Sequence, residues 1–176
     1  MDDAFFRAGA RSRAGALGSR RTGNLLGFLA CAGLIAFAYY LQFGQGVEPC
    51  PLCIIQRLLV AATGLVFLVA AIHHPGRAGA RVYGVLTMLV AGVGAAVAGR
   101  HVWIQHVPED KRPSCGPGLD YLVSTFGPFG GLQRILRGSG ECGKVDWTLL
   151  GLSIPEWTLA CFIALGIYAV FLATRD

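Results

Sequence analysis

Four long apolar segments, separated by polar and basic stretches, make up most of the chain. They cover residues 24–43, 54–72, 82–104 and 154–174. Each segment is apolar on all sides rather than along one stripe, which is typical of a helix surrounded by lipid. Because a bilayer span needs about 20 mostly apolar residues, the pattern predicts an all-α membrane protein, a bundle of four transmembrane helices.

The composition supports this prediction and excludes two other classes of protein. Of the 176 residues, 54% are hydrophobic and only 14% are charged, whereas soluble proteins have about 25% charged residues. This ratio excludes an intrinsically disordered chain, and it leaves too few charges to cover the surface of a water-soluble domain. The formal net charge of +5 would suit nucleic-acid binding only if the basic residues formed a patch.

The basic residues instead gather on one side of the predicted membrane. Five arginines precede the first span, two lie in the 73–81 loop and one follows the fourth span. The 44–53 loop has no lysine or arginine, and the five basic residues of the 105–153 segment are balanced by five acidic ones. Basic loops stay in the cytoplasm, so the charge pattern indicates topology and not nucleic-acid binding.

This topology predicts the organisation of the whole chain. We expect a basic cytoplasmic N-terminal tail over residues 1–23 and a membrane domain over residues 24–174. The membrane domain includes outer loops at 44–53 and 105–153, and residues 175–176 form a cytoplasmic C-terminus.

The six cysteines divide between span interiors and outer loops. Cys31 and Cys161 lie inside the first and fourth spans, where a buried thiol packs as a small apolar side chain. The other four lie in the two outer loops: Cys50, Cys53, Cys115 and Cys142. Because this division was not used to derive the topology, it independently supports an outer compartment in which disulfides persist.

The Cys50–Cys53 segment, CPLC, is a C-x-x-C motif, and such motifs serve redox chemistry or bind zinc. A zinc site could combine the four loop thiolates or include His101 or His106. However, Cys115 and Cys142 are 27 residues apart, unlike the compact paired spacing of structural zinc sites. Two structural disulfides are a further alternative. The pattern favours a redox-active pair.

Arg57 lies close to the second cysteine of this motif. Cys53 falls at or just before the start of the second span, where unpaired N–H groups and the helix dipole favour an anion. Arg57 is four residues further on, so it lies on the same helix face one turn away. Both features favour the thiolate, which is the reactive form of cysteine. The alternative is that Arg57 only extends to the lipid headgroups.

The long 105–153 loop contains the other two cysteines. Pro108, Pro113, Pro117 and the GPFGG stretch at 127–131 prevent a continuous helix. The apolar spacing over 119–126 predicts a short amphipathic helix on the membrane surface, or else a loop packed on the bundle. A flexible backbone around the cysteines suits a disulfide that meets a partner and is exchanged.

The chain resembles the DsbB family of bacterial inner-membrane disulfide-forming oxidoreductases over roughly residues 24–174. The resemblance rests on CPLCIIQR at the start of the second span, on the cysteine pair in the second outer loop, and on GECGKVDWTLLGLSIPEW before the fourth span. It implies an inner-membrane protein with cytoplasmic termini and periplasmic cysteine loops. It also implies that electrons pass from a periplasmic thioredoxin-like, DsbA-like carrier through two cysteine pairs to a membrane quinone, ubiquinone or menaquinone.

The resemblance also assigns roles to individual residues. Cys50 and Cys53 match the pair coupled to the quinone, and the pair formed by Cys115 and Cys142 matches the one that reacts with the carrier. Two residues match quinone neighbours of the family: Arg57 and His106. His101 lies close enough in the sequence to compete for the second of these matches, and Gln56 stands where some members have an acidic residue.

Two other functions remain as alternatives. A vitamin K epoxide reductase-like protein also combines a C-x-x-C motif with loop cysteines in a four-helix bundle. In that family the motif belongs to the last helices of the core, whereas here it opens the second span. A non-enzymatic membrane protein would use its disulfides only for stability, and such disulfides resist reduction by glutathione, unlike catalytic ones.

Overall fold

The structure is a computed structural model, and its described residues include four long helices. It describes residues 19–108, 124, 125, 127, 130, 140–143, 145 and 147–175. The long helices are α2 (Arg20–Gly44), α3 (Pro51–His73), α4 (Arg77–His106) and α6 (Ile154–Thr174). Each is long and apolar enough to cross a membrane. The predicted four-helix membrane bundle is therefore confirmed, and the chain is a multi-pass membrane protein.

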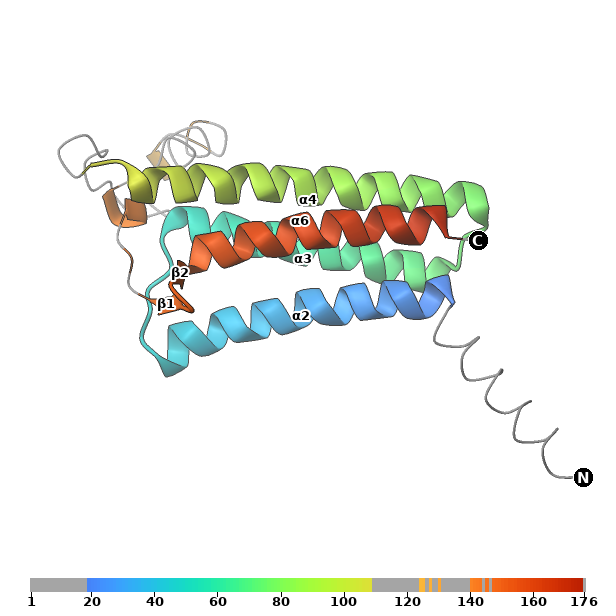
Figure 1. Cartoon of the computed structure of the whole chain (residues 1–176), viewed down its shortest axis with the longest axis horizontal. Coiled ribbons are helices and arrows are strands. Elements are labelled where there is room, and N and C mark those ends of the chain that lie inside the picture. Colours follow the sequence, from blue (N-terminus) through green and yellow to red (C-terminus); the bar gives the residue numbers. More distant parts are fainter. Residues whose placement is uncertain are drawn as a thin grey trace, which may run out of the picture.

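The four helices run antiparallel to their neighbours in sequence (Figure 1). The ends of α2 and α4 and the starts of α3 and α6 lie at one end of the bundle. Helix α4 packs against α6 and α3, and α2 packs against α3. The short 3-10 helix η2 (Gly140–Gly143) lies against α4 at this same end.

Small residues set the distance between the helices. A Cβ atom on Gly27 of α2 would lie 2.9 Å from the ring of Phe67 on α3, and one on Gly94 of α4 would overlap the ring of Phe162 on α6. Both aromatic rings are only 1% exposed. The outer faces remain apolar, as for Leu29 at 59% exposed, which is the pattern expected of helices that face lipid.

A short hairpin precedes α6 at the same end of the bundle. Its strands β1 (Thr148–Leu149) and β2 (Leu152–Ser153) pair antiparallel through a two-residue turn. The turn residues Leu150 and Gly151 have φ values of 54° and 82°, as a type I′ turn requires. The indole N–H of Trp157 donates to the carbonyl oxygen of Leu149 at 3.0 Å, so the hairpin is held on the first turn of α6.

A capping box fixes the start of α6. The backbone N–H of Ser153 donates to a carboxylate oxygen of Glu156 at 2.6 Å, which satisfies an otherwise unpaired donor of the first turn. The Ser153 hydroxyl lies 2.8 Å from the side-chain oxygen of Gln105 near the end of α4. The end of the hairpin is thereby attached to both α4 and α6.

Some sequence-based expectations fall outside the described residues. These are the position of Cys115, the 1–18 part of the tail, and the predicted 119–126 helix apart from Ser124 and Thr125, which are helical.

Candidate active site

The C-x-x-C motif forms the start of α3. Cys50 is the N-cap residue and Pro51 is the first helical residue, where its fixed φ angle suits the helix and its missing N–H costs nothing. Cys53 therefore lies in the first turn, as the sequence predicted. Its backbone N–H donates to Cys50 Sγ at 3.4 Å. The two sulfurs are thiols 3.2 Å apart, so a small movement would bring them to the 2.05 Å of a disulfide.

His101 of α4 lies directly beside this motif. Its Nε2 is 3.7 Å from Cys50 Sγ and 3.1 Å from the carbonyl oxygen of Cys142. Its Nδ1 is 3.1 Å from the side-chain nitrogen of Gln56. His101 is 2% exposed and Gln56 is 3% exposed. A buried polar network thus joins α3, α4 and η2 around the first cysteine.

Helix η2 brings a third cysteine to the same place. Cys142 is 1% exposed, and its sulfur, the Cys50 sulfur and a ring nitrogen of His101 lie within 4.8 Å of one another. Zinc accepts such atoms as ligands, so the zinc alternative stays an untested hypothesis. The same closeness is what sulfur exchange between Cys142 and Cys50 requires.

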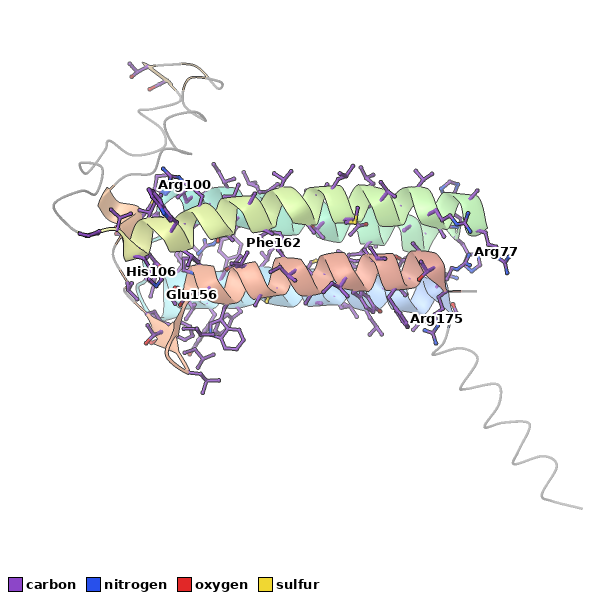
Figure 2. All side chains as sticks on the ribbon, turned by 45° about the horizontal axis from the view of Figure 1, so that its top comes forward. Arg77, Arg100, His106, Glu156, Phe162 and Arg175 are labelled. Carbon is purple, nitrogen blue, oxygen red and sulfur yellow. The ribbon has the colours of Figure 1, made fainter. Side chains whose placement is uncertain are left out.

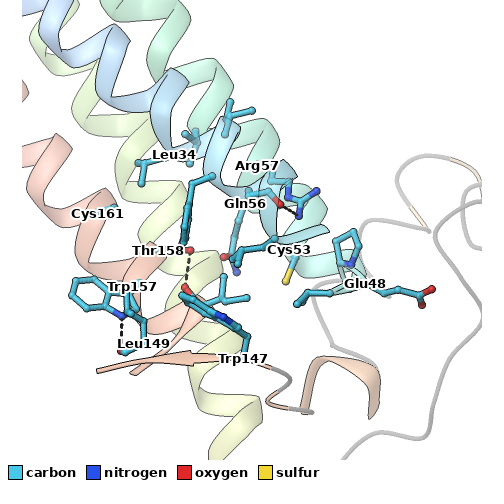
Figure 3. Close-up of a pocket in the computed structure, with 18 residues that line it drawn as sticks. Leu34, Glu48, Cys53, Gln56, Arg57, Trp147, Leu149, Trp157, Thr158 and Cys161 are labelled. Carbon is cyan, nitrogen blue, oxygen red and sulfur yellow. Dashed lines mark hydrogen bonds between the residues drawn. The ribbon is translucent and has the colours of Figure 1, made fainter. Parts of the chain in front are cut away.

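An apolar cavity of about 230 Å³ lies on the other side of Cys53 (Figure 3). Its walls come from α2, the loop between α2 and α3, α3, the hairpin segment and α6. From α3 they include Cys53, Gln56 and Arg57, and Trp147 and Trp157 come from the hairpin segment and α6. The remaining lining residues are Leu34, Ile35, Phe37, Ala38, Leu41, Val47, Glu48, Pro49, Val60, Leu149, Ile154, Thr158 and Cys161.

Arg57 extends from α3 to α2 at the wall of this cavity. Its guanidinium donates to the side-chain oxygen of Gln42 and to the carbonyl oxygen of Ala38 at 3.1 Å. It also lies 5.3 Å from the ring centre of Tyr39, a cation–π distance. These contacts hold Arg57 against α2 at the wall of the cavity.

The two histidines near the end of α4 face different surroundings. His106 is exposed, and its Nδ1 lies 2.9 Å from the carbonyl oxygen of Val102 on its own helix. It is not among the residues that line the cavity. Five residues along a helix correspond to a rotation of about 140°, so only His101 of this pair can face the bundle interior.

The sequence indicated His101 only as a candidate zinc ligand or as an alternative to His106. Its position follows from helical spacing that was visible in the sequence. Gly94, Ala98, His101 and Ile104 recur every three or four residues, and all four are buried on α4. The two tryptophans of the cavity had no such signal, because the bend of the hairpin brings them there. Cys161 was expected to be a packing residue, and it lines the cavity.

Comparison with known proteins identifies similar chains over most of the length. The family model described as disulfide bond formation protein DsbB matches residues 20–172. The disulfide bond formation protein B of Methylococcus capsulatus is 55% identical over 88% of this chain and 94% of its own length. The proteins of the same name from Xanthomonas oryzae pv. oryzae and Methylobacillus flagellatus are 52% and 48% identical, over 86% and 87% of this chain and 89% and 92% of their own lengths.

Proposed function

Because this chain belongs to the DsbB family of disulfide bond formation proteins, we propose that it is a protein-dithiol:quinone oxidoreductase. Family membership confirms the resemblance seen in the sequence and makes the chain a disulfide-forming membrane oxidoreductase. The proposal adds that it reoxidises a periplasmic DsbA-like dithiol carrier and passes the electrons through two cysteine pairs to a membrane quinone.

The order of the sulfurs is the observation that supports this route best. The Cys142 sulfur lies within 4.8 Å of Cys50 Sγ, and Cys50 Sγ lies 3.2 Å from Cys53 Sγ. Cys53 in turn lines the apolar cavity. A path therefore leads from the second outer loop, through the C-x-x-C motif, to a place where a ring of low polarity can bind.

Electrons enter the protein by thiol–disulfide exchange. A carrier thiolate attacks Cys115 of a Cys115–Cys142 disulfide, and the Cys142 thiolate leaves. That thiolate attacks Cys50 of the Cys50–Cys53 disulfide, which forms a Cys142–Cys50 disulfide and releases the Cys53 thiolate toward the cavity. Each step forms one S–S bond and breaks another, as exchange requires.

A second round of exchange releases the oxidised carrier. Its second thiolate attacks the mixed disulfide and frees the Cys115 thiolate. Cys115 then attacks Cys142 of the Cys142–Cys50 disulfide, and the Cys50 thiolate leaves. The outer pair is again a disulfide, and the two electrons now reside on the Cys50–Cys53 dithiol.

The cavity beside Cys53 has the properties that a quinone ring needs. Its walls are mostly apolar and include Trp147 and Trp157, and apolar cavities of roughly 150 Å³ already hold a benzene ring. Arg57 supplies a guanidinium donor for a carbonyl oxygen. A bound quinone would accept two electrons and two protons from the dithiol. The role of His106 as a quinone neighbour stays a prediction. His106 is not among the residues that line the cavity.

The two ends of the bundle support the proposed location. Arg77 and Arg175 lie at the end opposite His106 and Glu156 (Figure 2). Arg20 lies at the basic end too, because it donates to the carbonyl oxygen of Arg175 at 3.0 Å. We propose that this end faces the cytoplasm and that the cysteine end faces the periplasm, in the bacterial inner membrane. The domain limits of 1–23, 24–174 and 175–176 stay part of this proposal.

Quinone reduction by the purified protein tests the proposal. The full-length chain in detergent is mixed with a reduced periplasmic thioredoxin-like carrier and with a soluble ubiquinone or menaquinone analogue. We expect one quinone reduced for each carrier disulfide formed, and no turnover by Cys53→Ala. Carrier oxidation without quinone reduction would contradict the quinone route. Disulfides that persist in a glutathione buffer would instead favour a structural role.

A further inference from the structure

The geometry points to His101 as a further catalytic residue, whose Nε2–H stabilises the Cys50 thiolate as it leaves the Cys142–Cys50 disulfide, with Gln56 as the residue that positions the ring. This inference rests on the proposed function for the step in which it acts. The stabilisation itself requires neither the carrier nor the quinone.

The hydrogen on Nε2 follows from the partners of the ring. Nε2 lies 3.1 Å from the carbonyl oxygen of Cys142, and a carbonyl oxygen can only accept, so Nε2 must carry a hydrogen. A neutral imidazole then has a bare Nδ1, which can only accept. The Gln56 amide nitrogen, 3.1 Å from Nδ1, is a donor. The contacts on both ring nitrogens therefore agree on one tautomer.

Gln56 holds the ring in this state and orientation. It lies on α3, one turn from the C-x-x-C motif, and it is as deeply buried as His101. A carboxylate at this position would accept a hydrogen from Nδ1 and so compete for it, whereas the amide can donate to Nδ1. Gln56 acts on the sulfur only through the histidine ring and is therefore a positioning residue.

Nε2 lies 3.1 Å from the Cys142 carbonyl oxygen and 3.7 Å from Cys50 Sγ, so both atoms compete for its hydrogen. Hydrogen bonds to an ionised acceptor are roughly twice as strong as neutral ones, so the thiolate competes better for this donor than the thiol does. Burial of His101 strengthens the interaction further, because the local dielectric is low.

This contact acts in the step that returns the outer pair to its oxidised state. When the Cys115 thiolate attacks Cys142, the electron pair of the S–S bond leaves with Cys50. A better stabilised leaving thiolate departs faster. The His101 N–H beside Cys50 therefore favours attack on the Cys142 sulfur, because Cys50 is then the better leaving group. The two electrons of the broken S–S bond remain on the C-x-x-C motif.

Alkylation of Cys50 measures this stabilisation directly. The full-length protein carries Cys53→Ala, is reduced in a chelator-containing detergent buffer, and reacts with iodoacetamide at neutral pH. The modified Cys50 peptide is then quantified by mass spectrometry. His101→Leu should slow alkylation about three- to tenfold, because a hydrogen bond to a charged group is lost and thiol reactivity follows only part of that loss. His101→Gln keeps an amide donor and should stay within about twofold of the parent protein.

Two further variants complete the set. Gln56→Leu removes the group that orients the ring, so its alkylation rate should fall between those of the parent and His101→Leu. Thr87→Val is the matched control, because Thr87 is a polar residue of α4 that is 2% exposed and whose hydroxyl donates to Tyr83 O on the same helix. Its rate should equal that of the parent.

A second pH separates thiolate stabilisation from access to the sulfur. Among the described residues, the titratable groups placed against Cys50 are Cys53 of α3, His101 of α4 and Cys142 of η2. At a pH at which Cys50 is fully ionised, His101→Leu should react at least as fast as the parent, because a thiolate without this hydrogen bond is the stronger nucleophile. Equal slowing at both pH values, equal rates at neutral pH, or a His101→Gln variant as slow as His101→Leu would overturn the inference.

Turnover distinguishes this inference from the proposed function. With an otherwise native chain, His101→Leu should lower kcat for carrier oxidation while the quinone KM is unchanged. If no variant and no parent protein reduces quinone, the proposed function is wrong, and the alkylation rates still decide whether His101 stabilises the Cys50 thiolate.

Discussion

Cys50 takes part in two of the four exchange steps of the proposed route, first as the sulfur that Cys142 attacks and later as the leaving thiolate. It lies 3.2 Å from Cys53 Sγ and within 4.8 Å of the Cys142 sulfur. Its place at the N-cap also lets it accept the backbone N–H of Cys53. These contacts come from α3 on one side and from η2 on the other, which explains how one side chain can serve the cavity and the outer loop in turn.

Replacement of single cysteines tests this sulfur path. We predict that Cys→Ser at position 50, 53, 115 or 142 abolishes carrier oxidation, because each exchange step loses a sulfur. Cys31→Ala and Cys161→Ala should retain turnover, because neither sulfur takes part in an exchange step, even though Cys161 lines the cavity. Carrier oxidation by the purified variants measures this. Normal turnover by Cys115→Ser would show that the assignment of the outer pair is wrong.

Arg57 permits a second prediction at this scale. Arg57→Met should raise the quinone KM about tenfold or more, because a hydrogen bond from a charged donor contributes roughly 1.5–3 kcal/mol. Arg57→Lys should be partly active, since it keeps the charge but not the planar donor arrangement.

Arg100→Met is the matched control for Arg57, because Arg100 stacks on Trp103 at 4.3 Å on α4 and does not line the cavity. Steady-state kinetics with varied quinone measure both variants. An unchanged quinone KM in Arg57→Met, or an equal rise in Arg100→Met, would remove Arg57 from the site.

At the scale of the elements, the contact of α4 with α6 depends on the absence of a side chain at Gly94. Phe162 of α6 occupies the space that a Cβ atom on Gly94 would need. In membranes, helix association relies on such close packing, because lipid supplies no hydrophobic force between helices. His101 lies on α4, and the hairpin leads directly into α6, so the spacing of these two helices also affects the site.

Substitution at this interface should therefore destabilise the bundle. Gly94→Val forces Phe162 to move, and overpacking of this kind costs about 1–3 kcal/mol. Gly92→Val is the control on the same helix, because nothing lies within 4 Å of a Cβ atom there. Thermal unfolding in detergent should show a lower Tm for Gly94→Val only. Equal Tm values for the two variants would contradict the packing role of Gly94.

At the scale of the whole molecule, the arginines Arg77 and Arg175, which flank the spans, lie at the end of the bundle opposite the cysteine network (Figure 2). This separation follows from the antiparallel order of the helices. Basic residues remain on the cytoplasmic side, whereas disulfides persist in oxidising compartments. The two ends thus carry the features expected of opposite sides of one membrane.

Labelling of introduced cysteines tests this orientation. In a chain whose native cysteines are replaced by serine, a membrane-impermeant maleimide should label Asp110→Cys and Gly138→Cys in intact cells. Gly76→Cys should be labelled only after the cells are permeabilised, which also serves as the control for its reactivity. Labelling of Gly76→Cys in intact cells would reverse the topology, and with it the compartment of the cysteines.

The order of residues was enough to predict the four spans and the C-x-x-C motif at the start of α3, although α4 begins at Arg77, inside the predicted 73–81 loop. Arg57 and Cys53, which the sequence placed one helical turn apart, both line the cavity. These features depend on local order: helical periodicity, capping and residues one turn apart are fixed by a few neighbouring positions. Even the burial of His101 was encoded in the spacing of its own helix, although sequence analysis did not use that spacing.

Only the tertiary structure decided which distant segments meet. Cys142 lies beside Cys50, and Trp147 lies beside Cys53 at the cavity, because α4, η2, the hairpin and α6 converge at one end of the bundle. Periodicity within a helix says which face is buried but not which neighbour covers it, since that depends on how four helices pack together. For this reason the cavity and the contact between His101 and Cys50 follow from the packing of the bundle.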